Sequence, residues 1–152
     1  MLGNTYERQN CSVARALEVV GERWSLLIVR DALFGGLTRF TDFLHSLGLA
    51  RNILAARLNG LVEAGVLERR PAQDSRYDEY HLTEKGRDLA PVIIALTDWG
   101  DRWAAPKGPP AIYRHRCCGG EVTQQLVCRD CQQLLLPDQV EVHRGPGLAA
   151  AG

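Results

Sequence analysis

The sequence has no surplus of charge of either sign and no long hydrophobic run. Its 18 basic and 18 acidic residues give a formal net charge of +0, so overall charge does not favour nucleic-acid binding and any DNA-binding surface must be local. No apolar run approaches the roughly 18 residues of a membrane span, and no basic and apolar leader opens the chain. We therefore expect a cytoplasmic protein with no membrane partner.

Lysine is scarce, because only Lys85 and Lys107 occur among the 18 basic residues. GC-rich codon usage explains this excess of arginine more simply than phosphate recognition does, so arginine content alone does not indicate DNA binding.

Catalytic motifs are missing as well. Glu22, Asp31 and Asp42 stand singly, and the sequence has neither a serine, histidine and acid arrangement nor a phosphate-binding glycine pattern. We therefore do not expect an enzyme. The length of 152 residues, with 45% hydrophobic and 24% charged residues, instead indicates one modest globular domain with an appendage.

Residues 38–65 contain two segments with helical periodicity, separated by a short turn. Thr38 is the expected cap of the first segment, Gly48 marks its end, and Gly65 ends the second. The apolar stripe of the first segment consists of Phe40, Phe43, Leu44 and Leu47. The stripe of the second consists of Leu54, Leu58, Leu61 and Val62. Two short helices joined by a tight turn fit a helix-turn-helix.

A hairpin is expected after the second helix. Residues 66–71 and 77–83 are rich in strand-forming residues and flank a turn-like tetrad, residues 72–75. The order helix, turn, helix and hairpin predicts a winged helix-turn-helix, which is a mainly α fold of the α+β kind. The same pattern also suits a small α+β core that never contacts DNA, so periodicity alone does not decide the function.

Side-chain chemistry favours DNA. The residue types that pair with guanine or adenine edges in the major groove are Arg51, Asn52 and Arg57. The hairpin residues that suit phosphates or a minor groove are Arg69, Arg70 and Arg76. Arg39, just before the first of the two helices, completes the predicted DNA-binding set.

Several motifs occur in the order and spacing of one regulator family. They are the run from Cys11 to Leu33, Arg39-Phe40, Leu54 to Leu58, residues 61–65, Arg69-Arg70 and residues 80–86. With these motifs, residues 9–104 resemble the HxlR family of MarR-like bacterial transcriptional regulators. The resemblance implies a homodimer that binds a pseudo-palindromic operator in double-stranded DNA. Ala50 departs from the family, which usually places a capping serine there, and loss of such a cap costs about 1 kcal/mol.

Helices on either side of this motif are expected to form a dimer interface. An N-terminal stripe includes Val13 and Leu17, and Trp24 to Phe34 form a second helix with apolar residues almost all round. From Glu84, capped by Thr83, a heptad-like seam consists of Leu89, Val92, Leu96, Trp99 and Trp103. Pro91 kinks this helix or marks a first turn. The alternative is that these residues cover the core of their own chain. Residues 1–105 form the expected domain.

Residues 106–144 form a second, ribbon-like unit with paired metal-ligand residue types. His115 and Cys118 make an HxxC pair and Cys128 and Cys131 a CxxC pair, a spacing that suits one tetrahedral Zn²⁺. Such a small β-rich segment has little apolar surface, so metal binding would stabilise it directly. Alternative ligands are Cys117 and His143. The unit can also hold no metal, or Cys128 and Cys131 can form a disulfide, which a cytosolic location disfavours. Residues 145–152 are expected to be a frayed tail.

Cys11 stands apart from the other four cysteines, at the start of the first helix. A helix N-terminus favours the thiolate, and Arg15 one turn later adds to that effect. The family resemblance implies a redox or electrophile sensor, because some members carry one at this position. The alternative is a small thiol buried in the dimer interface. A small aromatic effector in an apolar cavity is a competing signal.

These observations predict a DNA-binding transcriptional regulator that responds to a redox, electrophilic or small-molecule signal. The alternative function is a protein-interaction module, in which the winged helix and the ribbon dock a protein instead of DNA.

Overall fold

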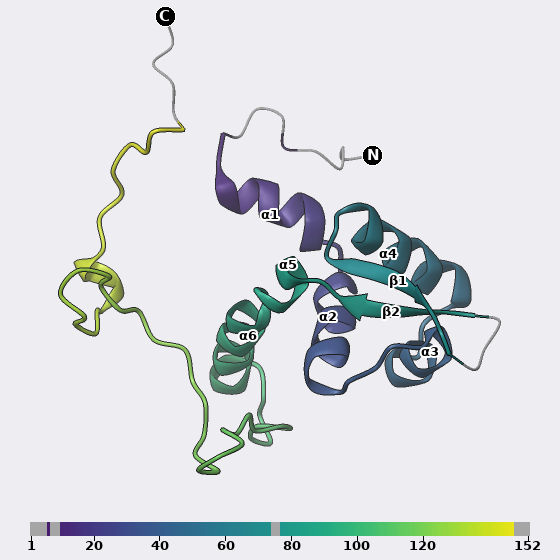
Figure 1. The fold of residues 1–152 in the computed structure, drawn as a ribbon. Helices are drawn as coiled ribbons and strands as arrows, with labels where there is room; N and C mark the ends of the chain where they lie inside the picture. The colour runs from purple at the N-terminus through teal and green to yellow at the C-terminus, as the bar shows by residue number, and fades with distance from the viewer. Residues whose placement is uncertain (1–5, 7–9, 74–76, 148–152) are drawn as a thin grey trace, which may run out of the picture. The chain divides into compact units, whose positions relative to one another are not determined.

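The computed structural model describes residues 6, 10–73 and 77–147 (Figure 1). The chain forms two compact units, Met1–Ile93 and Ile94–Gly152, and each is described here by itself. The division falls within the last long helix, before the boundary at residue 105 that the sequence suggested. The helices and strands are α1 (Ser12–Val20), α2 (Ser25–Phe34), α3 (Phe40–Leu47), α4 (Arg51–Glu63), β1 (Leu67–Pro71), β2 (Asp78–Leu82), α5 (Glu84–Arg87) and α6 (Ala90–Trp103). The predicted mainly α winged helix-turn-helix is confirmed.

The core of the first unit forms where the apolar stripes of α2, α3 and α4 meet the hairpin. Its buried side chains are Ile28, Val29, Phe43, Leu54, Leu58, Leu61, Val66, Leu67 and Ile93. Each large apolar side chain removed from water in this way stabilises the fold by about 1.5–3 kcal/mol. Two polar residues of α2, Ser25 and Asp31, are buried as well, and the Asp31 carboxylate accepts a 2.7 Å hydrogen bond from the Ser46 hydroxyl of α3. The stripes read from the sequence thus hold the two helices of the motif in place.

The helix ends follow the sequence at α3 with one correction. Gly48 ends α3 in the left-handed conformation, with φ of 62°. The cap is not Thr38, however, because α3 begins at Phe40 with Arg39 as its N-cap. The carbonyl of Thr38 instead accepts a 2.7 Å hydrogen bond from the N–H of Tyr80, which joins the segment before α3 to β2.

The wing is a two-stranded antiparallel hairpin. Its register pairs Leu67 with Leu82 and Pro71 with Asp78, within one residue of the expected strand limits. Of the expected turn, residues 74 and 75 lie outside the described residues. Burial decreases along β1 from Leu67 to Pro71, so the hairpin is rooted in the core and its tip is exposed.

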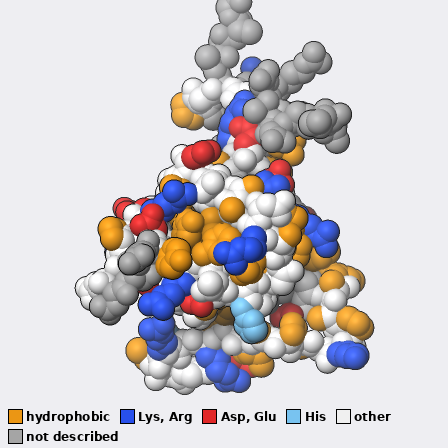
Figure 2. Space-filling view, turned by 90° about the vertical axis from the view of Figure 1, so that its right-hand side faces the viewer, with side chains coloured by type: hydrophobic (Ala, Val, Ile, Leu, Met, Phe, Trp, Pro, Cys, Tyr) orange, Lys and Arg blue, Asp and Glu red, His pale blue; other side chains and the backbone are white. Residues whose placement is uncertain are grey.

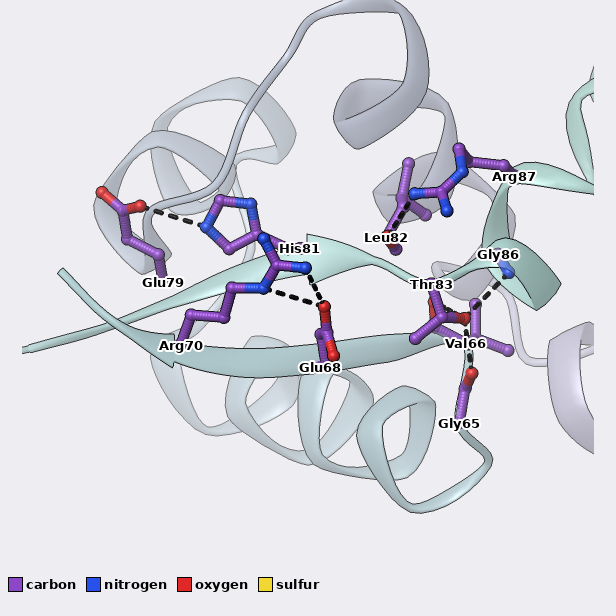
Figure 3. A network of polar contacts seen from close by, with 10 residues as sticks. All are labelled: Gly65, Val66, Glu68, Arg70, Glu79, His81, Leu82, Thr83, Gly86 and Arg87. Carbon is purple, nitrogen blue, oxygen red and sulfur yellow. Dashed lines mark hydrogen bonds and ion pairs between the residues drawn. The ribbon is translucent and has the colours of Figure 1, made fainter.

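The motif Thr83-Glu84-Lys85-Gly86 locks the wing to the end of α4 (Figure 3). The Thr83 hydroxyl lies 2.7 Å from the carbonyl of Gly65 and accepts a 3.2 Å hydrogen bond from the N–H of Gly86, so it caps α5 as predicted. Lys85 Nζ donates a 2.7 Å bond to the Ala64 carbonyl at the C-terminus of α4. Gly86 has no room for a side chain, because a Cβ there would lie 2.3 Å from the Val66 carbonyl oxygen.

The segment from Glu84 contains two helices instead of one. Pro91 is the second residue of α6, where a missing N–H removes no helical hydrogen bond. Leu89 precedes α6 and packs against the core of its own chain, which removes it from the predicted seam of an interface. The rest of that seam is exposed along α6 and consists of Val92, Leu96, Trp99 and Trp103.

The described part of the extension, residues 106–147, contains two isolated β-bridges and one 3₁₀ turn, η1 (Pro137–Gln139), in place of continuous strands. Asp98 of α6 accepts hydrogen bonds from the Thr123 hydroxyl at 2.7 Å and the Gln124 N–H at 2.9 Å. No residue of 106–147 is buried, so this segment has no hydrophobic core of its own.

Candidate nucleic-acid interface

A groove of about 680 Å³ opens between the start of α3, one face of α4 and the wing. Arg39, Arg51 and Arg69 all line it, each from a different one of these elements. Residues 51, 55 and 59 reach it from α4, because positions four apart share one helix face. The structure therefore brings together three arginines that lie far apart in the sequence.

Aromatic rings support two of these arginines. The guanidinium carbon of Arg51 lies 5.2 Å from the ring centroid of Phe40, and that of Arg69 lies 5.7 Å from the ring centroid of Tyr80. Asn59 Oδ1 accepts a hydrogen bond from Arg69 Nη2. A guanidinium stacked on a ring keeps its N–H edge in a fixed plane, which suits a base edge or a phosphate. Local sequence patterns do not indicate Phe40, Asn59 and Tyr80 as site residues, because only the fold places them beside the arginines.

Acidic residues partly neutralise the basic side chains of this surface. Arg39 Nε lies 3.3 Å from Glu79, which is also 3.1 Å from His81 Nε2. Arg70 is paired with Glu68 on the same face of β1 (Figure 3). Figure 2 accordingly shows basic side chains dispersed among apolar and acidic ones, without a continuous basic patch. A phosphate that approached Arg39 or Arg70 would therefore meet a guanidinium that already has a carboxylate partner.

The predicted set of base-reading residues needs one correction, because Arg57 does not line the groove. It lies two positions from residues 55 and 59, on another face of α4, and its Nη2 is 2.8 Å from Glu22 Oε2. It lines a separate cavity of about 460 Å³ between α1, the start of α2 and α4. Its Nε is buried and has no hydrogen-bond partner within the described part of the chain. Arg57 therefore belongs to the packing of α4 against α1 and not to the groove.

The remaining predicted DNA contacts are placed only in part. Asn52 is exposed at the start of α4, next to Arg51. Arg76 lies outside the described residues.

Cys11 is the exposed N-cap residue of α1. The backbone N–H groups of Ala14 and Val13 face its sulfur and hold the pKa of the thiol below its usual value. Arg15, which the sequence suggested as a second cause, forms an ion pair with Glu18 at 2.7 Å. Val13 and Leu17, the predicted interface residues of α1, are both exposed.

The paired metal-ligand residues lie in two turns of the extension. His115 Nδ1 is 3.1 Å from Cys118 Sγ. The backbone N–H groups of Cys131 and Asp130 face the Cys128 sulfur and hold the pKa of its thiol below its usual value. Among the residues that the structure describes, no three His, Cys, Asp or Glu side chains are grouped closely enough to hold a metal ion. The two pairs are thus each formed but are not brought together.

Among the described residues, no helix has the length and apolar character of a membrane span.

Comparison with known proteins gives the family. Residues 19–108 match the HxlR-like helix-turn-helix family. An uncharacterized HTH-type transcriptional regulator of Mycobacterium tuberculosis is 45% identical over 141 residues, which cover 91% of this chain and 89% of the relative. The crystal structure of PA1607, a candidate transcription factor, is 45% identical, with a TM-score of 0.83 over 91% of this chain and 98% of that chain.

A more distant similarity concerns a regulator with several solved states. The reduced form of the transcriptional regulator YodB from Bacillus subtilis is 29% identical, with a TM-score of 0.53 over 64% of this chain and 98% of that chain. A quinone-bound structure of YodB matches with a TM-score of 0.52, at 29% identity over 61% of this chain and 99% of that chain. The matched winged helix and the full-length relatives together show that this chain belongs to the HxlR-like helix-turn-helix family of transcriptional regulators.

Proposed function

We propose that the chain acts in the cytoplasm as a homodimer that binds a pseudo-palindromic operator, with α4 in the major groove and the wing on the flanking backbone. The groove lined by Arg39, Arg51 and Arg69 is the observation that carries this proposal. Arg51 and Asn52 occupy the first turn of α4, the part of a recognition helix that contacts base edges. Arg69 and Arg70 extend the contact to phosphates.

The homodimer is proposed because the helices outside the helix-turn-helix have an exposed apolar surface. Four large side chains of α6 are exposed in a row at heptad-like spacing, and Trp99 and Trp103 remain 62% and 65% exposed. Such a stripe marks an interaction surface more often than a monomer's solvent-facing helix. A dimer would place two readers about 34–36 Å apart, one turn of DNA, on two half-sites.

The signal is proposed to act at Cys11. Its thiol is exposed, its pKa is lowered, and it lies on the same helix as Val13 and Leu17. A thiolate adds to an electron-poor quinone carbon, a C–S bond forms, and the displaced electron pair takes up a proton at the quinone oxygen. An adduct beside a dimer helix would rotate the two readers and alter half-site spacing. The quinone-bound structure of YodB supports this class of signal.

A small effector in the cavity beside α1 is the competing signal. That cavity of about 460 Å³ is lined by Leu17, Val19 and Leu61 but also by the charged residues Glu18, Glu22 and Arg57. It therefore suits a ligand with polar groups better than a purely apolar aromatic molecule.

DNA binding is tested by fluorescence anisotropy of the full-length protein with the duplex upstream of its own gene and with random duplex, at several salt concentrations. Affinity should fall steeply from low to physiological salt. Arg51→Ala should cost about 1–3 kcal/mol on the operator and relax base preference, whereas Arg70→Ala should weaken all sequences alike. Equal losses on both duplexes for Arg51→Ala would contradict base reading, and binding without salt dependence would favour the protein-docking alternative.

A quinone or mild oxidant, added to the same binding reaction, tests the signal. Wild type should lose or change operator affinity and Cys11→Ser should not respond. A response that persists in Cys11→Ser would assign the signal to another site, either one of the four cysteines of the extension or the cavity.

A further inference from the structure

The extension contains a repeated turn. The second turn, residues 127–134, reproduces the first, residues 114–121, with every residue number raised by 13, so that Arg114 pairs with Glu121 and Val127 with Leu134. The repeat includes the backbone hydrogen bonds. His115 N donates to Gly120 O at 2.8 Å and Cys128 N to Gln133 O at 3.0 Å.

The left-handed residue of the turn also repeats. Gly119 N donates to His115 O at 2.8 Å, and Gln132 N donates to Cys128 O at 3.0 Å. Gly119 has φ of 70° and Gln132 has φ of 59°, which makes Gln132 the one non-glycine residue with positive φ in the described chain. A left-handed conformation at a glutamine costs about 1–2 kcal/mol. Gln132 adopts this unfavourable conformation at the position that matches Gly119. The two segments therefore share the backbone geometry of the turn, although their residues differ.

Each turn has metal-ligand residues at its second and fifth positions. The repeat matches His115 with Cys128 and Cys118 with Cys131, and no other His or Cys falls on this pattern. Cys117 matches Asp130, at the fourth position of the turn. His143 belongs to neither turn, and its Nε2 lies 3.4 Å from Glu141. The repeat therefore selects one set of four among the ligands that the sequence left open.

The donor atoms within a turn already have suitable spacing. The ligand distances of tetrahedral zinc, about 2.3 Å to sulfur and 2.0–2.1 Å to nitrogen, place neighbouring donor atoms about 3.5–4 Å apart. His115 Nδ1 and Cys118 Sγ lie 3.1 Å apart without an ion. A small outward movement of these two side chains would admit a metal ion between them.

Residues 106–147 lack a hydrophobic core, so another interaction must stabilise their folded conformation. No residue of 106–147 is buried, and its exposed large apolar side chains are Ile112, Val122, Leu126, Val127, Leu134, Leu136, Val140 and Val142. Backbone bridges alone do not stabilise so short a hairpin in water. A metal that joins the two turns would supply the missing link, because its binding free energy becomes folding free energy.

We propose that His115, Cys118, Cys128 and Cys131 bind one tetrahedral zinc ion that draws the two turns of the extension together. The ligand types, one imidazole and three thiolates, select zinc over hard cations. Binding releases three protons, because each thiol must become a thiolate, and it leaves the Zn²⁺ site with a formal charge of −1. The ion joins the two halves of the extension.

The test measures metal content of the full-length protein, purified under reducing conditions without chelator and with any affinity tag removed. Wild type should contain one zinc per chain by elemental analysis, and Cys118→Ser and Cys128→Ser should each lose it. Cys117→Ser and His143→Ala are the matched controls and should retain it. Circular dichroism of every variant checks that the helices of the first unit remain folded.

Cobalt provides a second readout that depends on the ligands themselves. The Co²⁺-loaded protein should show the visible bands of a tetrahedral site and thiolate charge-transfer bands, and both should weaken in Cys118→Ser and Cys128→Ser. Wild type that binds neither zinc nor cobalt would overturn the proposal. So would equal loss in Cys117→Ser, or a thiol count showing that Cys128 and Cys131 are joined in a disulfide.

Discussion

The guanidinium of Arg57 lies 2.8 Å from the carboxylate of Glu22, so the reader helix α4 is tied to the segment between α1 and α2. Both side chains are partly exposed, at 33% and 43%. An ion pair of this kind contributes about 0.2–1 kcal/mol. The pair links α4, the helix proposed to read DNA, to the segment that follows Cys11 and α1.

Glu22→Gln should lower the free energy of unfolding by no more than about 1 kcal/mol, because the exposed ion pair contributes little. Base preference should not change, since Arg57 lies outside the groove. Urea unfolding and operator anisotropy measure the two effects. If Glu22→Gln lost as much base preference as Arg51→Ala, Arg57 would have to be counted among the residues that contact bases.

Ala50→Ser should stabilise the protein by about 1 kcal/mol. Ala50 is the N-cap of α4 in an extended conformation, with φ of −66° and ψ of 140°, and lacks a side chain that could accept a hydrogen bond from the first turn. Ala56→Ser, in the middle of the same helix, is the control and should lower stability slightly because serine is a weaker helix former. Thermal unfolding followed by circular dichroism measures both, and an unchanged Ala50→Ser midpoint would contradict the capping argument.

Gly86→Ala should destabilise the fold by about 1–3 kcal/mol, because overpacking forces backbone shifts. The new Cβ would lie 2.3 Å from the Val66 carbonyl oxygen and 2.7 Å from Leu82 Cδ2. Gly60→Ala is the matched control, since a Cβ there meets nothing within 4 Å. Alanine in that helix should stabilise by up to about 1 kcal/mol. Chemical unfolding of the two variants should therefore give shifts of opposite sign.

Alkylation of Cys11 should reach half its maximal rate at a lower pH than an ordinary cysteine, whose pKa is about 8.5. The N–H groups of Ala14 and Val13 lower the pKa, so the reactive thiolate persists as pH falls through the usual value. The measurement is the iodoacetamide rate against pH for a variant that keeps Cys11 alone. The same chain in denaturant is the control, and coincident midpoints in the two states would show that the folded α1 does not activate the thiol.

Leu96→Glu should convert a dimer to monomer, because it places a charge in the exposed apolar stripe of α6. Light scattering after size exclusion gives the mass. Ile53→Glu, which adds the same charge at an exposed apolar residue of α4, should leave the mass unchanged. A wild type that is monomeric at micromolar concentration would contradict the dimer proposal.

Local patterns predicted the elements of the reader well. The apolar stripes of α3 and α4 repeat at helical spacing, Gly48 and Gly65 end those helices, and strand formers define the hairpin. Such features depend on residues close together in the chain, so the sequence alone contains them. The family resemblance also depends on residues close together in the chain. In the Thr83 to Gly86 motif, the Thr83 hydroxyl, the Lys85 ammonium group and the missing side chain of Gly86 together form the contact between the wing and α4.

Side-chain direction was the part that local patterns did not determine. Arg51 and Arg57 are both arginines of one helix, yet one lines the groove and the other pairs with Glu22. Leu89 follows the heptad spacing but is partly buried against the core, because it lies between the separate helices α5 and α6.

The sequence by itself determined the winged helix-turn-helix, the family and the cysteine and histidine residues of the extension, because each is encoded in short-range spacing. Only the tertiary structure decided which arginines share a surface and which are paired with carboxylates, because residues far apart in the chain must first meet. It also showed that His115 and Cys128 occupy equivalent places in a repeated turn, since backbone hydrogen bonds that the two sequences do not reveal define that equivalence.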